Sequence, residues 1–194
     1  MKDVREEQIV ERAKKGDPGA KALIVEKYER MVYNLGLRLL SNHEEAECVL
    51  QDTFLKILQS IDTFKGDSQL STWIYRIATN QALMRLRKKK RQYVSIDGDD
   101  EDESRDYSNI LRSFHANPLE DLLNTELKDK MRVAIDRLPP KHRSVFVLKD
   151  IEGLSLKEIS DILDMSLPAV KSNLHRARLF LRENLSEFIN GKEK

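Results

Sequence analysis

The sequence predicts an all-α protein made of two small helical domains, which a flexible acidic linker joins. Apolar residues recur at helical spacing along most of the 194 residues, and no alternation of apolar and polar residues is long enough to predict a strand. Between residues 92 and 116 this periodicity fails, and the composition becomes acidic with Gly and Ser. We therefore expect one domain at residues 1–91, a linker at residues 92–116 and a second domain at residues 117–194.

The first domain is expected to contain four helices, and capping residues mark the starts of the second and third. Asp17 precedes Pro18, which suits an N-cap followed by proline at the first helical position. Asn42, with Glu45 three residues later, forms a capping pair for the third helix. The fourth helix follows a polar loop and is expected to end in a basic cluster at Arg91.

The second domain is expected to begin at Asn117, where an N-cap precedes Pro118. Its first helix runs to Leu138 and ends at two prolines. A second helix follows to about Glu152, and Gly153 ends it. A further pair of helices, at residues 155–182, is expected to follow them.

The pair at residues 155–182 has the pattern of a helix-turn-helix. Ser155 and Glu158 form a capping box for its first helix, and Ser166 can cap its second helix after a short turn. Two helices joined by three to four residues are typical of the motif that places its second helix in the major groove of DNA.

The second helix of this pair has two chemically different faces. At about 100° per residue, four apolar side chains form one face: Val170, Leu174, Ala177 and Leu181. The outer face carries short polar and cationic groups: Lys171, Ser172, His175 and Arg176. Such groups reach base edges and phosphates of duplex DNA. A solvated basic surface helix is the alternative, but the helix-turn-helix context favours DNA.

The fourth helix of the first domain carries a different polar stripe. Residues 71–91 hold seven basic side chains and no acidic one, and Trp73, Arg76, Asn80 and Arg87 share one side of the helix. An unpaired base offers a ring face for stacking and an edge for hydrogen bonds, so this stripe suits single-stranded DNA. Core packing is the alternative for Trp73 alone.

Several classes of protein do not fit this sequence. It has no apolar run long enough to cross a membrane, and its first residues lack the apolar segment of a secretory signal. Cys48 is the only cysteine, so we expect a reducing cytoplasm and no membrane insertion. The four histidines lack partners at metal-ligand spacing, and no phosphate-binding loop or hydrolase motif is present. We expect no enzyme activity, no metal and no cofactor.

Four segments in order resemble bacterial RNA polymerase sigma factors, specifically the small extracytoplasmic-function (ECF) group. They are AECVLQDTFLKI (46–57), FKGDSQLSTWIYRIATNQA (64–82), LPPKHRSVFVLKDIEGLSLKEIS (138–160) and AVKSNLHRARLFLR (169–182). The resemblance implies that the first domain binds the polymerase clamp and melts and reads the minus-10 promoter element. It implies that the second domain reads the minus-35 element as duplex, and that the linker threads the polymerase.

The resemblance also assigns roles to individual residues. Gln51 and Asp52 match residues that dock on the polymerase clamp, whereas Cys48 stands where many members have an acidic residue. The loop that captures a flipped base of the non-template strand is matched by Phe64, Lys65, Gly66, Asp67 and Ser68, with Arg76 and Asn80 beside it. The duplex-reading positions are matched by Lys149, Lys171, Ser172, His175 and Arg176.

The predicted function is a sigma factor that directs core RNA polymerase to promoters in a stress or envelope response. Its implied partners are core polymerase, promoter DNA as duplex and as non-template single strand, and an anti-sigma factor. A stand-alone helix-turn-helix regulator that binds only duplex DNA is the alternative, and a helical module that binds acidic proteins is a third reading. The acidic residues 99–103 of the linker suit either a solvated spacer or a mimic of nucleic-acid charge.

Overall fold

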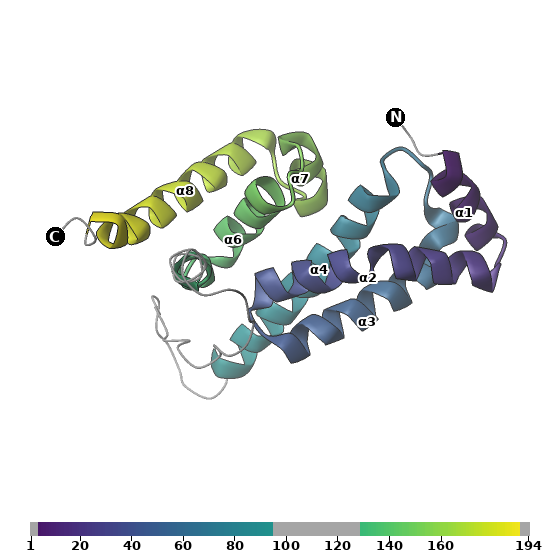
Figure 1. Ribbon diagram of the computed structural model, residues 1–194, viewed down its shortest axis with the longest axis horizontal. Coiled ribbons are helices and arrows are strands. Elements are labelled where there is room, and N and C mark those ends of the chain that lie inside the picture. The colour runs from purple at the N-terminus through teal and green to yellow at the C-terminus, as the bar shows by residue number, and fades with distance from the viewer. Residues whose placement is uncertain (1–3, 95–128, 191–194) are drawn as a thin grey trace, which may run out of the picture.

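The computed structural model describes residues 4–94 and 129–190, and every regular element in these two ranges is helical (Figure 1). The predicted all-α class is confirmed. Most of the predicted linker and the expected helix start at Asn117 lie outside the described residues. We refer to residues 4–94 as the amino-terminal lobe and to residues 129–190 as the carboxy-terminal lobe.

Four α-helices and one short 3₁₀ turn build the amino-terminal lobe. They are α1 (Val4–Lys14), α2 (Pro18–Leu40), α3 (His43–Ser60), η1 (Ile61–Thr63) and α4 (Leu70–Val94). The helix α4 continues three residues beyond the expected end at Arg91. The longer helices α2, α3 and α4 pack against one another, and α1 crosses one end of α2 (Figure 1).

The side-chain caps predicted for α2 and α3 are present in the structure. The Asp17 carboxylate accepts hydrogen bonds from the backbone amides of Gly19 and Ala20, at 2.8 and 3.3 Å. Asn42 caps α3 by accepting from the Glu45 amide at 2.8 Å. The Glu45 carboxylate binds Arg85 on α4, so this side chain ties the start of α3 to the neighbouring helix.

The carboxy-terminal lobe is a chain of short helices followed by a long one. Residues 129–136 are helical, and α6 (Pro140–Phe146), η2 (Val147–Ile151), α7 (Leu156–Leu163) and α8 (Leu167–Asn190) follow. The sequence predicted one α-helix to about Glu152, but its second half is a π-helical turn, in which the Glu152 amide donates to the Val147 carbonyl at 2.9 Å. Gly153 then turns the chain with a φ of +76°.

The two lobes are docked against each other through a shared apolar core. Buried residues of α2, α3 and α4 form one cluster with buried residues of α6, η2, α7 and α8, among them Leu148 and Ile159. The helix α4 packs against α7 (Figure 1). A smaller cluster of Ala134, Leu138, Ala177 and Leu181 holds α8 within its own lobe. Burial of this apolar surface stabilises the docked arrangement.

Polar contacts surround the shared core, and Glu152 makes two of them. Its carboxylate accepts a hydrogen bond from the Tyr75 hydroxyl at 2.6 Å and pairs with Arg38. Burial and the neighbouring carboxylate raise the pKa of Tyr75, which therefore keeps its proton. Thr72 on α4 donates to Glu158 on α7 at 2.9 Å. Residues that are far apart in the sequence thus join the two lobes directly.

Candidate nucleic-acid interfaces

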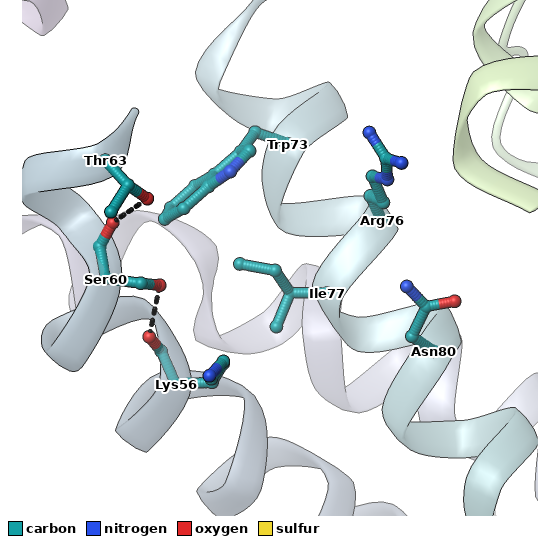
Figure 2. Close-up of a pocket in the computed structure, with 7 residues that line it drawn as sticks. All are labelled: Lys56, Ser60, Thr63, Trp73, Arg76, Ile77 and Asn80. Carbon is teal, nitrogen blue, oxygen red and sulfur yellow. Dashed lines mark hydrogen bonds between the residues drawn. The ribbon is translucent and has the colours of Figure 1, made fainter. Parts of the chain in front are cut away.

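A pocket of about 400 Å³ lies between α3, η1 and α4 in the amino-terminal lobe (Figure 2). This volume suits a small-molecule group such as a nucleobase. Three of its lining residues belong to the polar stripe predicted on α4, and four come from elsewhere in the two helices and η1: Trp73, Arg76 and Asn80, then Lys56, Ser60, Thr63 and Ile77. The structure therefore adds an opposite wall to the stripe that the sequence predicted.

The apolar side of the pocket is a supported aromatic ring. Trp73 is half-buried, and its ring lies 5.3 Å from that of the buried Phe64, at an interplanar angle of 47°. Ile77 lies one turn further along α4 (Figure 2). Because Phe64 packs behind Trp73, the indole is held in place with part of its surface exposed in the pocket.

The polar side of the pocket has a defined set of donors and acceptors. The Ser60 hydroxyl donates to the Lys56 carbonyl and the Thr63 hydroxyl donates to the Ser60 carbonyl, both at 2.6 Å (Figure 2). With their protons engaged, these hydroxyls can accept hydrogen bonds from a ligand. Lys56 and Arg76 can only donate. A base that has both an exocyclic amino group and a carbonyl matches this arrangement.

The loop predicted to capture a base surrounds the pocket less closely than expected. Phe64 is buried behind Trp73, whereas Lys65, Asp67 and Ser68 are exposed and none of these loop residues is among those that line the pocket. Gly66 turns the loop with a φ of +77°. Their assignment to DNA binding stays a prediction.

The sequence reasoning missed Lys56, Ser60, Thr63 and Ile77. A signal for three of them was present, because positions 56, 60 and 63 are spaced at i, i+4 and i+7 and therefore share one side of the chain as it leaves α3. What spacing could not show is that this side faces α4 across a hollow.

In the carboxy-terminal lobe, α8 has the two faces that the sequence predicted. Val170, Leu174, Ala177 and Leu181 are buried. On the outer face the four predicted duplex-reading residues are exposed: Lys171, Ser172, His175 and Arg176. The exposure leaves their side chains open to a ligand, and their contact with DNA stays a prediction.

Lys149 lies apart from these four residues. It belongs to η2, is half-buried, and donates from Nζ to the Leu154 carbonyl at 3.0 Å. The Lys149 ammonium therefore holds the loop before α7. Its remaining N–H groups can donate hydrogen bonds to a phosphate.

Two further electrostatic interactions affect ionisable groups on or beside α8. Arg178 forms a two-pronged pair with Asp150, at 2.9 and 2.6 Å, which raises the pKa of Arg178. Burial and the charge of Arg176 lower the pKa of His142. The imidazole of His142 therefore favours its neutral form beside the exposed outer face.

The first helix of the pair is held by the predicted capping box. The Glu158 amide donates to Ser155 Oγ at 3.2 Å, and the Ser155 amide donates to the Glu158 carboxylate at 2.9 Å. These hydrogen bonds and that from Thr72 lower the pKa of Glu158. The turn between the helices places Asp164 at a φ of +53°, and α8 begins at Leu167.

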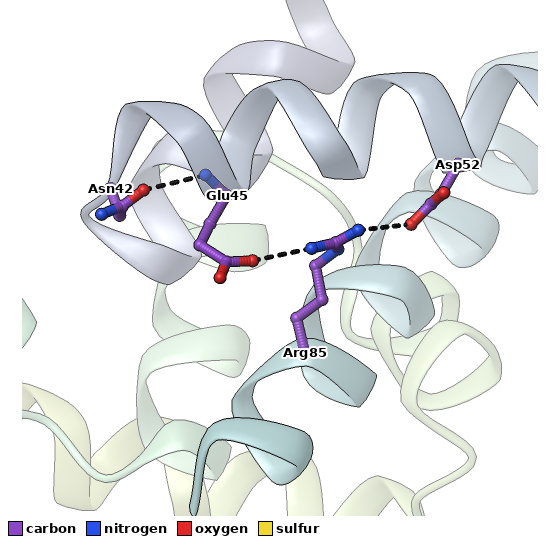
Figure 3. A network of polar contacts seen from close by, with 4 residues as sticks. All are labelled: Asn42, Glu45, Asp52 and Arg85. Carbon is purple, nitrogen blue, oxygen red and sulfur yellow. Dashed lines mark hydrogen bonds and ion pairs between the residues drawn. The ribbon is translucent and has the colours of Figure 1, made fainter. Parts of the chain in front are cut away.

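A second polar cluster lies on α3 (Figure 3). Arg85 of α4 donates to Glu45 at 2.9 Å and to Asp52 at 2.8 Å, and the Asp52 contact is the main cause of the raised pKa of Arg85. Gln51, the other predicted polymerase-binding residue, is exposed. Cys48 is a half-buried free thiol on the same helix.

The fold and these surfaces define a helical DNA-binding protein of the helix-turn-helix class with a separate pocket in its other lobe. Two family models of bacterial sigma factors match the chain. Residues 24–92 match sigma-70 region 2, and residues 128–181 match sigma-70 region 4.

Whole-chain relatives narrow this class to one group. The ECF RNA polymerase sigma factor SigW of Bacillus subtilis (strain 168) is 38% identical over 179 residues, which cover 92% of this chain and 95% of SigW. RNA polymerase sigma-H factor of Pseudomonas aeruginosa is 32% identical, with 90% of each chain covered. The chain belongs to the ECF sigma factors, the subunits that direct RNA polymerase to promoters.

Solved structures agree with this assignment. The sigma factor RpoE of Bartonella quintana, in complex with the anti-sigma factor NepR, superposes with a TM-score of 0.63 at 25% identity and covers 88% of this chain and 97% of its own. CnrH, in complex with the cytosolic domain of CnrY, has the same TM-score at 20% identity, with 92% and 95% covered, and shares the fold.

Within residues 4–94 and 129–190, no helix has the length and hydropathy to span a bilayer. Over the same ranges, His, Cys, Asp and Glu side chains form no group of three that could hold a metal ion.

Proposed function

We propose that the two lobes bind the same promoter in two forms. The carboxy-terminal lobe binds it as duplex, and the amino-terminal lobe binds one separated strand. The pocket between α3 and α4 carries this proposal. It combines a supported ring, Trp73, with donors and acceptors within one hollow that is large enough to admit a base. A duplex keeps its bases stacked and paired, so only an unstacked base can use such a pocket.

The upstream half of the proposal rests on α8. Its outer face presents Ser172, His175 and Arg176 without an acidic neighbour between residues 166 and 182. The helix-turn-helix arrangement lets the start of α8 enter a major groove, where these side chains would meet base edges and Lys171 a phosphate. The lobe would thereby read the minus-35 element.

Besides promoter DNA, the same proposal includes two protein partners and a compartment. Core RNA polymerase would dock on α3 at Gln51 and Asp52 and supply all of the chemistry, so that this chain catalyses no reaction. Because RpoE of Bartonella quintana forms a complex with the anti-sigma factor NepR, we propose an anti-sigma partner here also. The chain would act in the cytoplasm, where polymerase and DNA are found.

A double-mutant cycle that combines a substitution in the pocket with an abasic site in the DNA tests the pocket directly. Asn80 is exposed at the rim, so Asn80→Ala removes an amide without disturbing the core. We expect it to weaken binding of the polymerase complex to a premelted promoter. On a template with an abasic site at the base that enters the pocket, the same substitution should cost nothing more.

The control for this cycle is Gln81→Ala, which removes an amide from the neighbouring half-buried position outside the pocket lining. Additive losses from Asn80→Ala and the abasic site would show that the two do not meet, and the pocket would then have another use. A stand-alone duplex-binding regulator would be unaffected by either change.

A further inference from the structure

Three residues of α3 lie on the side that faces α4, and an arginine of α4 binds two of them. Glu45, Cys48 and Asp52 are spaced at i, i+3 and i+7, which places them on one side of the helix. Arg85 reaches from α4 to this side and gives one nitrogen to each carboxylate, at 2.9 Å for Glu45 and 2.8 Å for Asp52 (Figure 3). The guanidinium therefore orients two acids that are two turns apart.

Arg85 is the better buried member of this cluster. Its side chain is 28% exposed, against 38% for Glu45 and 43% for Asp52. Its Nε is buried and has no hydrogen-bond partner in the structure, so the side chain is held by packing and by the two carboxylates. A planar guanidinium fixed in this way loses little further freedom when a ligand arrives, and it restricts the acids that it binds.

The outer side of α3 stays acidic after this pairing. Glu44 and Glu47 are exposed on the same helix, and Asp52 is bound to Arg85 through only one of its oxygens in the structure. A basic partner can therefore still approach the second carboxylate oxygen. Exposed pairs of this kind are individually weak, so Arg85 is better suited to orienting Asp52 than to withholding it.

We propose that Arg85 is a positioning residue for polymerase binding, which holds Asp52 in the orientation in which α3 presents it to the polymerase. This inference rests on the proposed docking of polymerase at Gln51 and Asp52. A side chain already ordered in the free protein loses less conformational freedom on association, and the gain appears as affinity. Arg85 acts through Asp52 and need not touch the polymerase itself.

The experiment measures the affinity of the full chain for core polymerase in the absence of DNA. We expect Arg85→Gln to weaken binding roughly two- to tenfold, the range for the ordering of one flexible side chain. Arg85→Lys keeps the charge and should restore part of the loss. Arg30→Gln removes one exposed positive charge from α2 in the same lobe and should leave the affinity unchanged.

A cycle with Asp52→Ala separates positioning from general stability. In the Asp52→Ala background Arg85→Gln should cause no further loss, because the carboxylate through which Arg85 is proposed to act is absent. A role of Arg85 that does not act through Asp52 would make the two losses additive, and damage to the fold as a whole would also weaken minus-35 duplex binding. Circular dichroism at the assay temperature confirms that each variant is folded.

The possible failures are distinct. If Asp52→Ala leaves the affinity for core polymerase unchanged, the proposed docking on α3 is wrong, and the role of Arg85 is overturned with it. If Asp52→Ala weakens binding but Arg85→Gln does not, or strengthens it, the docking stands and Arg85 is not a positioning residue.

Discussion

The α3–α4 pocket and the outer face of α8 both combine cations with small polar groups, yet they differ in shape and in support. The pocket is a hollow with Trp73 packed on Phe64 at one side and hydroxyl acceptors opposite. The face of α8 is a helix surface over a buried apolar stripe. A hollow accepts a single base out of its stack, whereas a helix surface fits a groove that is already formed.

This difference teaches that charge alone does not tell which form of DNA a surface binds. Both regions are basic in sequence, and what separates them is whether a large aromatic ring lies in a hollow where a single base can stack on it. The substitutions below test that distinction, from the largest expected effect to the smallest.

Trp73→Ala should give the largest change. It removes the stacking surface, which is worth about 1–3 kcal/mol per base, and also the packing on Phe64. Binding of the polymerase complex to a premelted promoter should fall, as measured by competition with unlabelled template. Trp73→Phe keeps a ring and should retain most of the binding. An equal loss on an isolated minus-35 duplex would break the distinction between the two surfaces.

Arg176→Ala should cost about 1–3 kcal/mol at one upstream base pair if the guanidinium reads a base edge. The measurement is the affinity for a set of minus-35 duplexes that differ at single positions. Preference should relax at one position only. Arg182→Ala, on a later turn of α8, should leave the preference unchanged. A uniform loss across all duplexes would assign Arg176 to a phosphate.

Glu152→Gln should loosen the contact between the lobes. Glu152 binds Tyr75 and Arg38 of the other lobe, and a hydrogen bond to a charged group contributes about 1.5–3 kcal/mol. We expect the free energy of unfolding to fall and the thermal transition to broaden as the lobes unfold less cooperatively. Asp150→Asn breaks a pair within the carboxy-terminal lobe and is the control. A single sharp transition in both variants would contradict the bridging role of Glu152.

Ser155→Ala should lower stability without changing which DNA is bound. Loss of an N-cap costs about 1 kcal/mol, and Ser155 caps α7 rather than α8. Chemical denaturation measures the first effect, and the minus-35 duplex set measures the second. A change of base preference would mean that α7 takes part in reading.

The smallest effect should be a dependence on acid pH that belongs to Glu158. Hydrogen bonds lower its pKa in the folded protein, so its contribution to stability is present above the unfolded value of about 4.3. That contribution is lost as the pH falls through the lowered pKa. Thermal melting between pH 3 and 6 should show a smaller acid loss for Glu158→Gln than for the native chain. Parallel curves would remove Glu158 as the source.

The parts of the molecule that could be predicted from sequence are those fixed by residues close together in the chain. The caps at Asp17, Asn42 and Ser155 and the buried stripe of α8 depend on spacings of two to four residues, and the structure has them. A local rule also predicted the helix before Gly153, but its second half is a π-turn. Here a local contact of Lys149 with Leu154 and a distant contact of Glu152 with Tyr75 accompany a departure from the regular helix.

What the sequence could not show are contacts between distant segments. Lys56 and Asn80 line one pocket, and Glu45, Asp52 and Arg85 form one cluster, across 24 to 40 positions of the chain. Thr72 and Glu158 are 86 positions apart. Periodicity predicts which side of each helix is polar, but only packing decides which polar sides meet.

The central claim is that this chain gives RNA polymerase its choice of promoter, and run-off transcription tests it most directly. Purified core polymerase is supplied with a library of genomic fragments, with and without the full chain. The account predicts transcripts that appear only with the chain and start at fragments sharing two separated motifs, and that are reduced by both Trp73→Ala and Arg176→Ala. Transcripts that are the same with and without the chain would contradict it.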